Sequence, residues 1–287
     1  MNPFSSRCCQ HNHAQGWPYF TEHLVLATPD NGVATAIYAA CKATVKVGDG
    51  KEITLHEETN YPFEEAIAFT VSTGEKVAFP FYLRIPSWTK GAEVRVNGKK
   101  VSVTPVAGKY LCINREWANG DRVELTLPMS LSMRTWQVNK NSVSVDYGPL
   151  TLSLKIAEKY VEKDSRETAI GDSKWQKGAD SKKWSTTEIY PDSPWNYSLV
   201  LDKKEPLKNF KVIRKSWPTD NYPFTVTSVP LEVKAIGRPV PEWKIDETGL
   251  CGVLPEEDAV KGDKEEITLI PMGAARLRIS AFPNTKE

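Results

Sequence analysis

The stretch Val77-Ala-Phe-Pro-Phe-Tyr-Leu-Arg-Ile-Pro86 contains the clearest structural pattern of the chain. Its large apolar residues occupy every second position, namely Val77, Phe79, Phe81, Leu83 and Ile85. Successive side chains of a β-strand point to opposite faces of the sheet, so this spacing places all five on one face. Pro86 ends the run because it lacks the N–H that a sheet ladder needs. The stretch therefore predicts a β-strand with one buried face.

Short strands of the same kind surround this one and are separated by turn sequences. Gly48-Asp49-Gly50 predicts a hairpin, and Asn97-Gly98 is the strongest short hairpin signal. The strands predicted around residues 77–85 are 34–38, 42–47, 51–57, 67–71, 93–96, 101–103, 110–114 and 123–127. About eight short strands within about a hundred residues predict that residues 31–130 form a β-sandwich.

A second β-rich segment follows from residue 131 to residue 287. Its predicted strands are 142–147, 150–154, 197–201, 210–213, 231–236, 266–270 and 276–279. Residues 158–187 are poor in aliphatic residues and rich in Lys, Asp and Ser, so we expect a long surface excursion that Trp175 and Trp184 anchor. The pattern predicts a second β-sandwich.

Residues 1–30 differ from the rest of the chain. Trp17, Phe20, Leu24 and Ala27 follow the spacing of one helical face, and Pro18 suits a first helical turn. The turn residues 29–32 predict the end of this helix. A single amphipathic helix of about three turns cannot form a core by itself. We therefore expect its apolar face to pack against another part of the protein.

The bulk composition excludes several classes of function. Lys plus Arg number 37 and Asp plus Glu 36, so the net charge is +1 and nothing predicts a nucleic-acid partner. No apolar run reaches the ~18 residues that a membrane span needs. The first residues do not resemble a signal peptide, so we expect either a cytoplasmic chain or a true N-terminus further upstream. In the second case the protein is periplasmic or secreted if a signal peptide precedes it. Five cysteines without regular spacing do not indicate a disulfide framework.

The segment Cys8-Cys9-Gln-His11-Asn-His13 is the part of the chain richest in reactive side chains. Adjacent cysteines form a disulfide only with distorted geometry, whereas two thiolates bind a soft metal ion more easily. Zinc takes about four ligands, so Cys8 and Cys9 supply half of a site. His11 and His13 would complete it within unusually few residues. The alternative is that both cysteines are simply buried, as cysteine often is.

Carboxylates and aromatic residues offer weaker signals. A glycosidase needs two carboxyl groups, or equivalents, about 5–10 Å apart. The pairs 57–58 and 64–65 are Glu-Glu, but a solvated sheet face or turn explains them more simply. Asp146 is likewise expected in a turn. Trp88, Trp117 and Trp195 are suited either to stacking on sugar rings or to core packing. Cys41, Cys112 and Cys251 are expected to be structural, with Cys112 buried on a strand.

The run Cys8-Cys9-x-x-Asn12-x-x-Gln15-Gly16-Trp17-Pro18-x-Phe20 resembles the end of the catalytic barrel in glycoside hydrolase family 127, whose founding activity is β-L-arabinofuranosidase. The likeness spans nearly the whole chain. The further motifs are Thr28-Pro29-Asp30, Thr59-Asn60-Tyr61-Pro62-Phe63, Leu83-Arg84-Ile85-Pro86-Ser87-Trp88, Val96-Asn97-Gly98, Trp117-x-x-Gly120-Asp121, Leu127-Pro128-Met129, Gly148-Pro149-Leu150, Ser193-Pro194-Trp195-Asn196-Tyr197 and Leu269-Ile270-Pro271-x-Gly273.

The resemblance implies a fold and a set of roles. It implies a mainly β chain with two consecutive β-sandwich domains, preceded over residues 1–30 by the end of an (α/α)6 barrel. It further implies that Cys8 is both zinc ligand and catalytic nucleophile and that Cys9 is a second zinc ligand. A further Glu and Cys would complete the Zn²⁺ site, and another Glu would be the general acid/base. All three come from barrel sequence that precedes the cysteine pair in the family.

The reaction implied is retaining hydrolysis of an oligosaccharide, in which the Cys8 sulfur attacks the anomeric carbon. We then expect this chain to be a C-terminal portion that is inactive without the upstream barrel domain. His11, His13 and Ala14 depart from the shared pattern, and they leave the sugar open between arabinofuranose and a related plant-polysaccharide sugar. Two alternatives are a non-catalytic carbohydrate-binding or accessory β-sandwich protein, and a small structural zinc protein that uses Cys8, Cys9, His11 and His13.

Overall fold

The computed structural model describes residues 12, 14–168, 180, 182–247, 249–256 and 262–286. The chain divides into two compact units, one formed by His13–Ser130 and the other containing Leu131–Glu287. Most described residues that are in regular structure lie in strands, so the prediction of a mainly β protein is confirmed. Within the described residues, no helix has the length and hydrophobicity needed to cross a bilayer.

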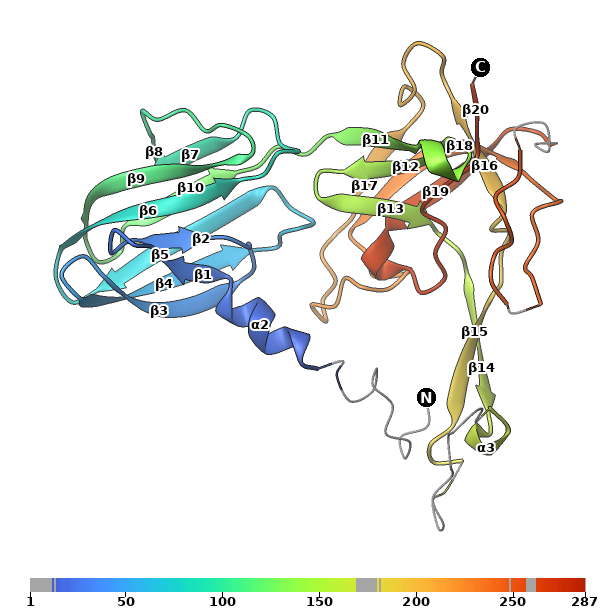
Figure 1. Cartoon of the computed structure of the whole chain (residues 1–287), viewed down its shortest axis with the longest axis horizontal. Coiled ribbons are helices and arrows are strands. Elements are labelled where there is room, and N and C mark those ends of the chain that lie inside the picture. The colour runs from blue at the N-terminus through green and yellow to red at the C-terminus, as the bar shows by residue number, and fades with distance from the viewer. Residues whose placement is uncertain are drawn as a thin grey trace. The chain divides into compact units, whose positions relative to one another are not determined.

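The first unit consists of two sheets (Figure 1). The four-stranded sheet has the order β1 (Val25–Ala27), β2 (Val33–Thr35), β6 (Val77–Ile85) and β9 (Lys109–Trp117). The six-stranded sheet has the order β3 (Cys41–Val47), β4 (Lys51–Thr59), β5 (Ala66–Thr73), β10 (Arg122–Thr126), β7 (Glu93–Val96) and β8 (Lys99–Lys100). Strand β2 pairs in parallel with β6, and the other pairs are antiparallel.

The core of this unit lies between the two sheets, as expected for a sandwich. All five alternating residues of the stretch 77–85 are buried, so the strand predicted there is confirmed. They meet buried residues of β4, β5, β7 and β10 from the six-stranded sheet. Phe81 and Phe69 make the contact across the sheets with ring centroids 5.4 Å apart in a T-shaped arrangement.

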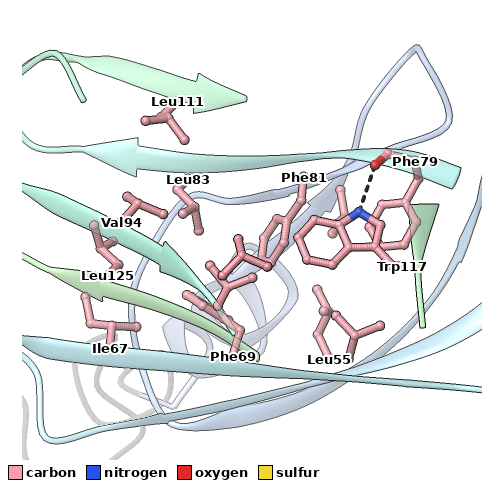
Figure 2. Packing of buried hydrophobic residues seen from close by; sticks show 14 of the residues in the cluster. Leu55, Ile67, Phe69, Phe79, Phe81, Leu83, Val94, Leu111, Trp117 and Leu125 are labelled. Atoms are coloured by element: carbon pink, nitrogen blue, oxygen red, sulfur yellow. Dashed lines mark hydrogen bonds between the residues drawn. The ribbon is translucent and has the colours of Figure 1, made fainter. Parts of the chain in front are cut away.

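Trp117, the last residue of β9, belongs to this core and is fully buried (Figure 2). Its ring stacks on Phe79 at 5.6 Å and meets the edge of Phe81 at 5.9 Å. Its indole N–H donates to the main-chain oxygen of Phe79 at 3.0 Å, so burial leaves this polar atom satisfied. Trp117 is therefore a core residue and does not offer its ring to a sugar.

Two family motifs meet at the turns of the first unit. Asn97 and Gly98 both have positive φ, as a two-residue hairpin requires, and β7 pairs with β8 directly on either side of them. The second strand was predicted at residues 101–103, which is wrong because so short a loop makes pairing resume at Lys99. The Asn97 amide donates to the Asp121 carboxylate at 2.7 Å, and Asp121 also accepts from the main-chain N–H of Ala118.

The helix before β1 is shorter than predicted. Helix α2 spans Gly16–Glu22, and residues 25–27 form β1 instead of a further helical turn. Pairing with β2, in the register Leu26 with Ala34, takes these residues into the sheet. The turn chemistry at residues 29–32 therefore joins two strands. No residue of α2 is buried, and Trp17 and Tyr19 are 64% and 66% exposed.

The second unit is built on an eight-stranded sheet. Along its main path the strands are β11 (Leu131–Trp136), β12 (Ser142–Tyr147), β13 (Leu150–Leu154), β19 (Glu265–Pro271), β18 (Leu231–Pro239), β16 (Tyr197–Leu201) and β20 (Asn284–Lys286), and β17 (Lys211–Arg214) pairs with β18. Short 3-10 turns lie at Gln137–Asn139 and Met272–Ala274. The strand predicted at residues 276–279 is absent. This segment makes isolated main-chain hydrogen bonds instead of a continuous ladder, such as the one that the Leu154 N–H donates to the Ile279 oxygen.

The two ends of the predicted surface excursion pair with each other. Strands β14 (Glu158–Lys163) and β15 (Thr186–Pro191) form a two-stranded antiparallel ribbon that extends away from the eight-stranded sheet (Figure 1). A short helix, α3 (Ser165–Thr168), follows β14. Trp184 is 45% exposed, with the Lys183 ammonium 5.9 Å from its ring, so it does not anchor the segment in a core. Trp175 lies outside the described residues.

Candidate functional site

The cysteine pair that the sequence singled out lies outside the described residues. Cys8, Cys9, His11 and His13 are all in this position, so the roles of Cys8 and Cys9 stay predictions. The donor chemistry suits zinc, because two adjacent thiolates supply soft sulfur ligands, but zinc takes about four ligands. Among the described residues, no group of three His, Cys, Asp or Glu side chains lies together. The described part of the chain thus offers no complete zinc site.

A groove of about 480 Å³ runs between the end of helix α2 and strand β3. Phe20, Leu24 and Val25 line one side, and Cys41 and Ala43 line the other. Leu24 is buried, while Phe20 is 39% exposed. Helix α2 begins close after Cys8 and Cys9 in the sequence. Residues that line the groove therefore follow the predicted catalytic residues closely in the sequence.

Glu57 lies behind Cys41 and is 1% exposed. It follows Ile53 and Leu55 on the core-facing side of β4, and it pairs in register with Cys41 on β3. The prediction that the carboxylates at 57–58 lie on a solvated face is wrong for Glu57. The same two-residue spacing that buries Ile53 and Leu55 carries this carboxyl group inward. The position of Glu57 two residues after Leu55, on the same face of the strand, was the sequence signal that could have predicted its burial.

The Glu57 carboxyl group has few partners. The Cys41 thiol donates to its Oε2 at 3.8 Å, and the main-chain N–H of Ala39 also bonds to the group. Within the described residues its Oε1 has no hydrogen-bond partner. Burial raises the pKa of Glu57 to about 8, because desolvation penalises the charged form more than these two hydrogen bonds favour it. Glu57 is therefore mostly protonated at neutral pH.

The polar region around Glu57 also includes Tyr38, Tyr61 and Arg84. Tyr61 and Arg84 belong to two of the motifs that carry the family resemblance. The Tyr38 hydroxyl donates to the main-chain oxygen of Arg84 at 2.5 Å, and the rings of Tyr38 and Tyr61 meet edge to face at 5.8 Å. Burial raises the pKa of both tyrosines. The Arg84 Nε is buried and has no partner within the described residues. The motifs around Tyr61 and Arg84 thus come together next to Glu57 and Tyr38.

Cys41 is poorly suited to act as a nucleophile in this polar region. Burial raises the pKa of the Cys41 thiol to about 11, and the neighbouring Glu57 carboxyl adds to the effect. The thiol, rather than the reactive thiolate, is then the form present at neutral pH. The other cysteines that the structure describes are Cys112, which is only partly buried, and Cys251, which is exposed. The prediction of a buried Cys112 is therefore only partly met.

The remaining predicted carboxylates have structural partners or face solvent. Glu58 pairs with Arg122 at 3.2 Å, and Glu65 accepts from the main-chain N–H of Met129 at 2.9 Å. Asp146 lies in strand β12 rather than in a turn, and Arg134 binds both of its oxygens at 2.7 and 2.9 Å. Glu64 is exposed. Each of these carboxyl groups therefore either has a structural partner or is exposed.

The two other tryptophans considered for sugar stacking also pack within the protein. Trp88 is partly buried against the core of the first unit. Trp195 meets the buried Trp243 with ring centroids 5.2 Å apart. Both side chains therefore serve in packing within the protein, rather than in stacking on a sugar.

The middle part of the chain matches a known family. Residues 32–129 match the family described as the GH127 middle domain of β-L-arabinofuranosidase. These residues are similar to a GH127 middle domain. The match spans β2 to the end of the first unit, and it contains Cys41, Glu57 and Trp117. The resemblance to glycoside hydrolase family 127 is thus confirmed on this segment.

Solved GH127 structures share the fold over nearly the whole chain. A GH127 β-L-arabinofuranosidase from Geobacillus stearothermophilus is 22% identical with a TM-score of 0.63, and the alignment covers 98% of this chain and 38% of that one. A second GH127 β-arabinofuranosidase is 22% identical with a TM-score of 0.64, and it is covered over 39% of its length. A comparison with curated proteins finds no match. The chain spans about two fifths of the length of the structures that it matches.

Proposed function

We propose that this chain is part of a retaining glycoside hydrolase that acts on L-arabinofuranosides or related plant-polysaccharide sugars, with Cys8 as its nucleophile. The match of residues 32–129 to the GH127 middle domain is the observation that carries the proposal. The fold that the second unit shares with GH127 structures agrees with it. Cys8 and Cys9 lie shortly before this domain, where the family motif places its paired thiols.

Cys8 and Cys9 are the residues of this chain that would hold a zinc ion. When bound, zinc stabilises the thiolate form, which a free cysteine adopts only in small part at neutral pH. The Cys8 sulfur then attacks the anomeric carbon as the bond to the leaving oxygen breaks, and a water molecule later displaces the sulfur. The leaving oxygen must receive a proton from a general acid.

That general acid is proposed to lie outside this chain. Glu58, Glu65 and Asp146 are held by structural partners, and the buried Glu57 is enclosed in the first unit. The chain also covers only about two fifths of the GH127 structures that it matches. We therefore infer that a barrel domain of the same gene product supplies the acid/base and the remaining zinc ligands. The first unit would hold α2 by way of the β1–β2 pair.

The isolated chain is expected to bind zinc weakly and to leave aryl L-arabinofuranosides intact. Two thiolates supply about half of the ligands that zinc needs. In the protein joined to the upstream barrel, the zinc content after dialysis, measured by atomic emission, should fall in Cys8→Ser and Cys9→Ser. It should stay unchanged in Cys251→Ser, whose thiol is exposed and remote in sequence. Joined to the upstream barrel, the chain should gain hydrolysis that Cys8→Ser abolishes.

Two results would contradict this proposal. Hydrolysis by the isolated chain would show that the acid/base lies within it. Full hydrolysis by the barrel-linked Cys8→Ser variant would remove Cys8 from the chemistry.

A further inference from the structure

A cavity of about 660 Å³ lies where the β14–β15 ribbon joins the second unit. Its walls come from the start of β14, the segment after β15, the loop before β18 and the segment after β19. The residues that carry the argument are Glu158, Tyr160, Ser193, Thr225, Thr227 and Arg276. The volume lies within the range of about 300–1,000 Å³ that small-molecule sites occupy.

Glu158 organises one wall of this cavity. Its side chain is only 3% exposed. It accepts a hydrogen bond from the Tyr160 hydroxyl at 2.5 Å and another from the main-chain N–H of Arg276 at 3.1 Å, and the Arg276 guanidinium lies 3.6 Å away. These contacts fix the Tyr160 ring on the wall, while half of its surface remains exposed. The Tyr160 ring is thus held in place beside the ion pair of Glu158 and Arg276.

Hydroxyl groups line the other walls. Thr225 and Thr227 lie with their side-chain oxygens 3.1 Å apart, and the Ser193 oxygen accepts from the main-chain N–H of Ala157 at 2.9 Å. Lys155, which also lines the cavity, donates to Glu232 at 2.7 Å. Each charged side chain at the cavity thus has an ion-pair partner, Glu158 with Arg276 and Lys155 with Glu232, and hydroxyl groups provide the remaining polar contacts.

We propose that this cavity is a binding site for a neutral oligosaccharide, separate from the predicted catalytic residues. An exposed ring offers an apolar face to the C–H face of a sugar, and hydroxyl and guanidinium groups bond its hydroxyls. An anionic ligand would find the cations at the cavity already paired, Arg276 with Glu158 and Lys155 with Glu232. An apolar ligand would leave the polar groups of the walls unpaired. The choice of a sugar as the ligand class rests on the proposed glycosidase function.

The test is a calorimetric titration of the full chain with neutral arabino-oligosaccharides. Tyr160→Ala should weaken binding about tenfold through the lost ring face. Arg276→Lys should also weaken binding, because a lysine cannot present the planar donor pair. Tyr190→Ala is the matched control, since Tyr190 lies on the same ribbon, is 45% exposed and donates to Glu188, yet does not line the cavity. Circular dichroism checks the fold of each variant.

The outcomes separate this site from the proposed catalytic function. Saturable binding that survives Cys8→Ser and Tyr190→Ala but falls in Tyr160→Ala and Arg276→Lys supports it, whether or not the protein hydrolyses the sugar. Absence of saturable binding, or an equal loss in Tyr190→Ala, would overturn it. Tighter binding of polygalacturonate than of neutral oligosaccharides would also overturn it, because the site would then select an anion.

Discussion

Replacing Trp117 with alanine is expected to lower the free energy of unfolding of the first unit by about 3–5 kcal/mol, the range for a buried tryptophan truncated in a close-packed core. The ring is fully buried and contacts Phe79 and Phe81. Its removal also leaves the Phe79 main-chain oxygen without the indole donor. Domains are stable by only about 5–15 kcal/mol, so this change removes a large part of the margin.

Urea denaturation with matched variants measures this effect. Trp117→Phe keeps most of the apolar contact but loses the N–H donor, and we expect it to cost about 1–3 kcal/mol. Trp17→Ala removes a tryptophan that is 64% exposed on α2 and should change the urea midpoint little. A Trp117→Ala midpoint close to that of Trp17→Ala would show that the core does not depend on this ring.

The unfolding free energy of the first unit should fall as pH rises between about 4.5 and 8, and Glu57→Gln should remove this fall. The ordinary pKa of a glutamate is 4.5, and burial raises that of Glu57 to about 8. Between these values the folded state holds a proton that the unfolded state has released, so raising the pH favours unfolding. We expect Glu57→Gln to be more stable than the natural protein at pH 9 by about 2–4 kcal/mol.

Urea midpoints measured from pH 5 to pH 9 test this prediction. Glu58→Gln is the control, because the Glu58 carboxylate is next to Glu57 in the sequence but is exposed. It pairs with Arg122 on the surface, where ion pairs contribute about 0–1 kcal/mol. The Glu58 variant should follow the natural protein at every pH. If the Glu57 variant kept the natural pH dependence, another group would be responsible for it.

The sequence predicted the strands of the first unit well because their patterns are local. Alternation over residues 77–85 and the Asn97-Gly98 turn depend on neighbouring residues alone, and both are confirmed. Helix α2 was predicted too long, because Leu24 and Ala27 also fit a helical face. The competing pairing of β1 with β2 is a contact between separate segments, and helical spacing cannot reveal it.

The candidate sites were less accessible to sequence reasoning. Glu57 was grouped with Glu58 as a surface pair, although strand register sends these two neighbours to opposite faces. The cavity at Tyr160 depends on segments more than a hundred residues apart, as the bond between Glu158 and Arg276 shows. No spacing rule brings these two residues together. The cysteine pair differs from both, because a local sequence motif was enough to single it out. It lies outside the described residues, so its role stays a prediction.

The β1–β2 pairing has a consequence for anyone who shortens this protein. Strand β1 is the outer strand of the four-stranded sheet and covers the main-chain groups of β2. A truncated protein that began at residue 31 would keep β2 but lose β1, the strand that pairs with its outer edge. The bare row of N–H and C=O groups would then be free to pair with other molecules, which is a common route to aggregation. Expression of the sandwich as a soluble module therefore calls for a start ahead of residue 25.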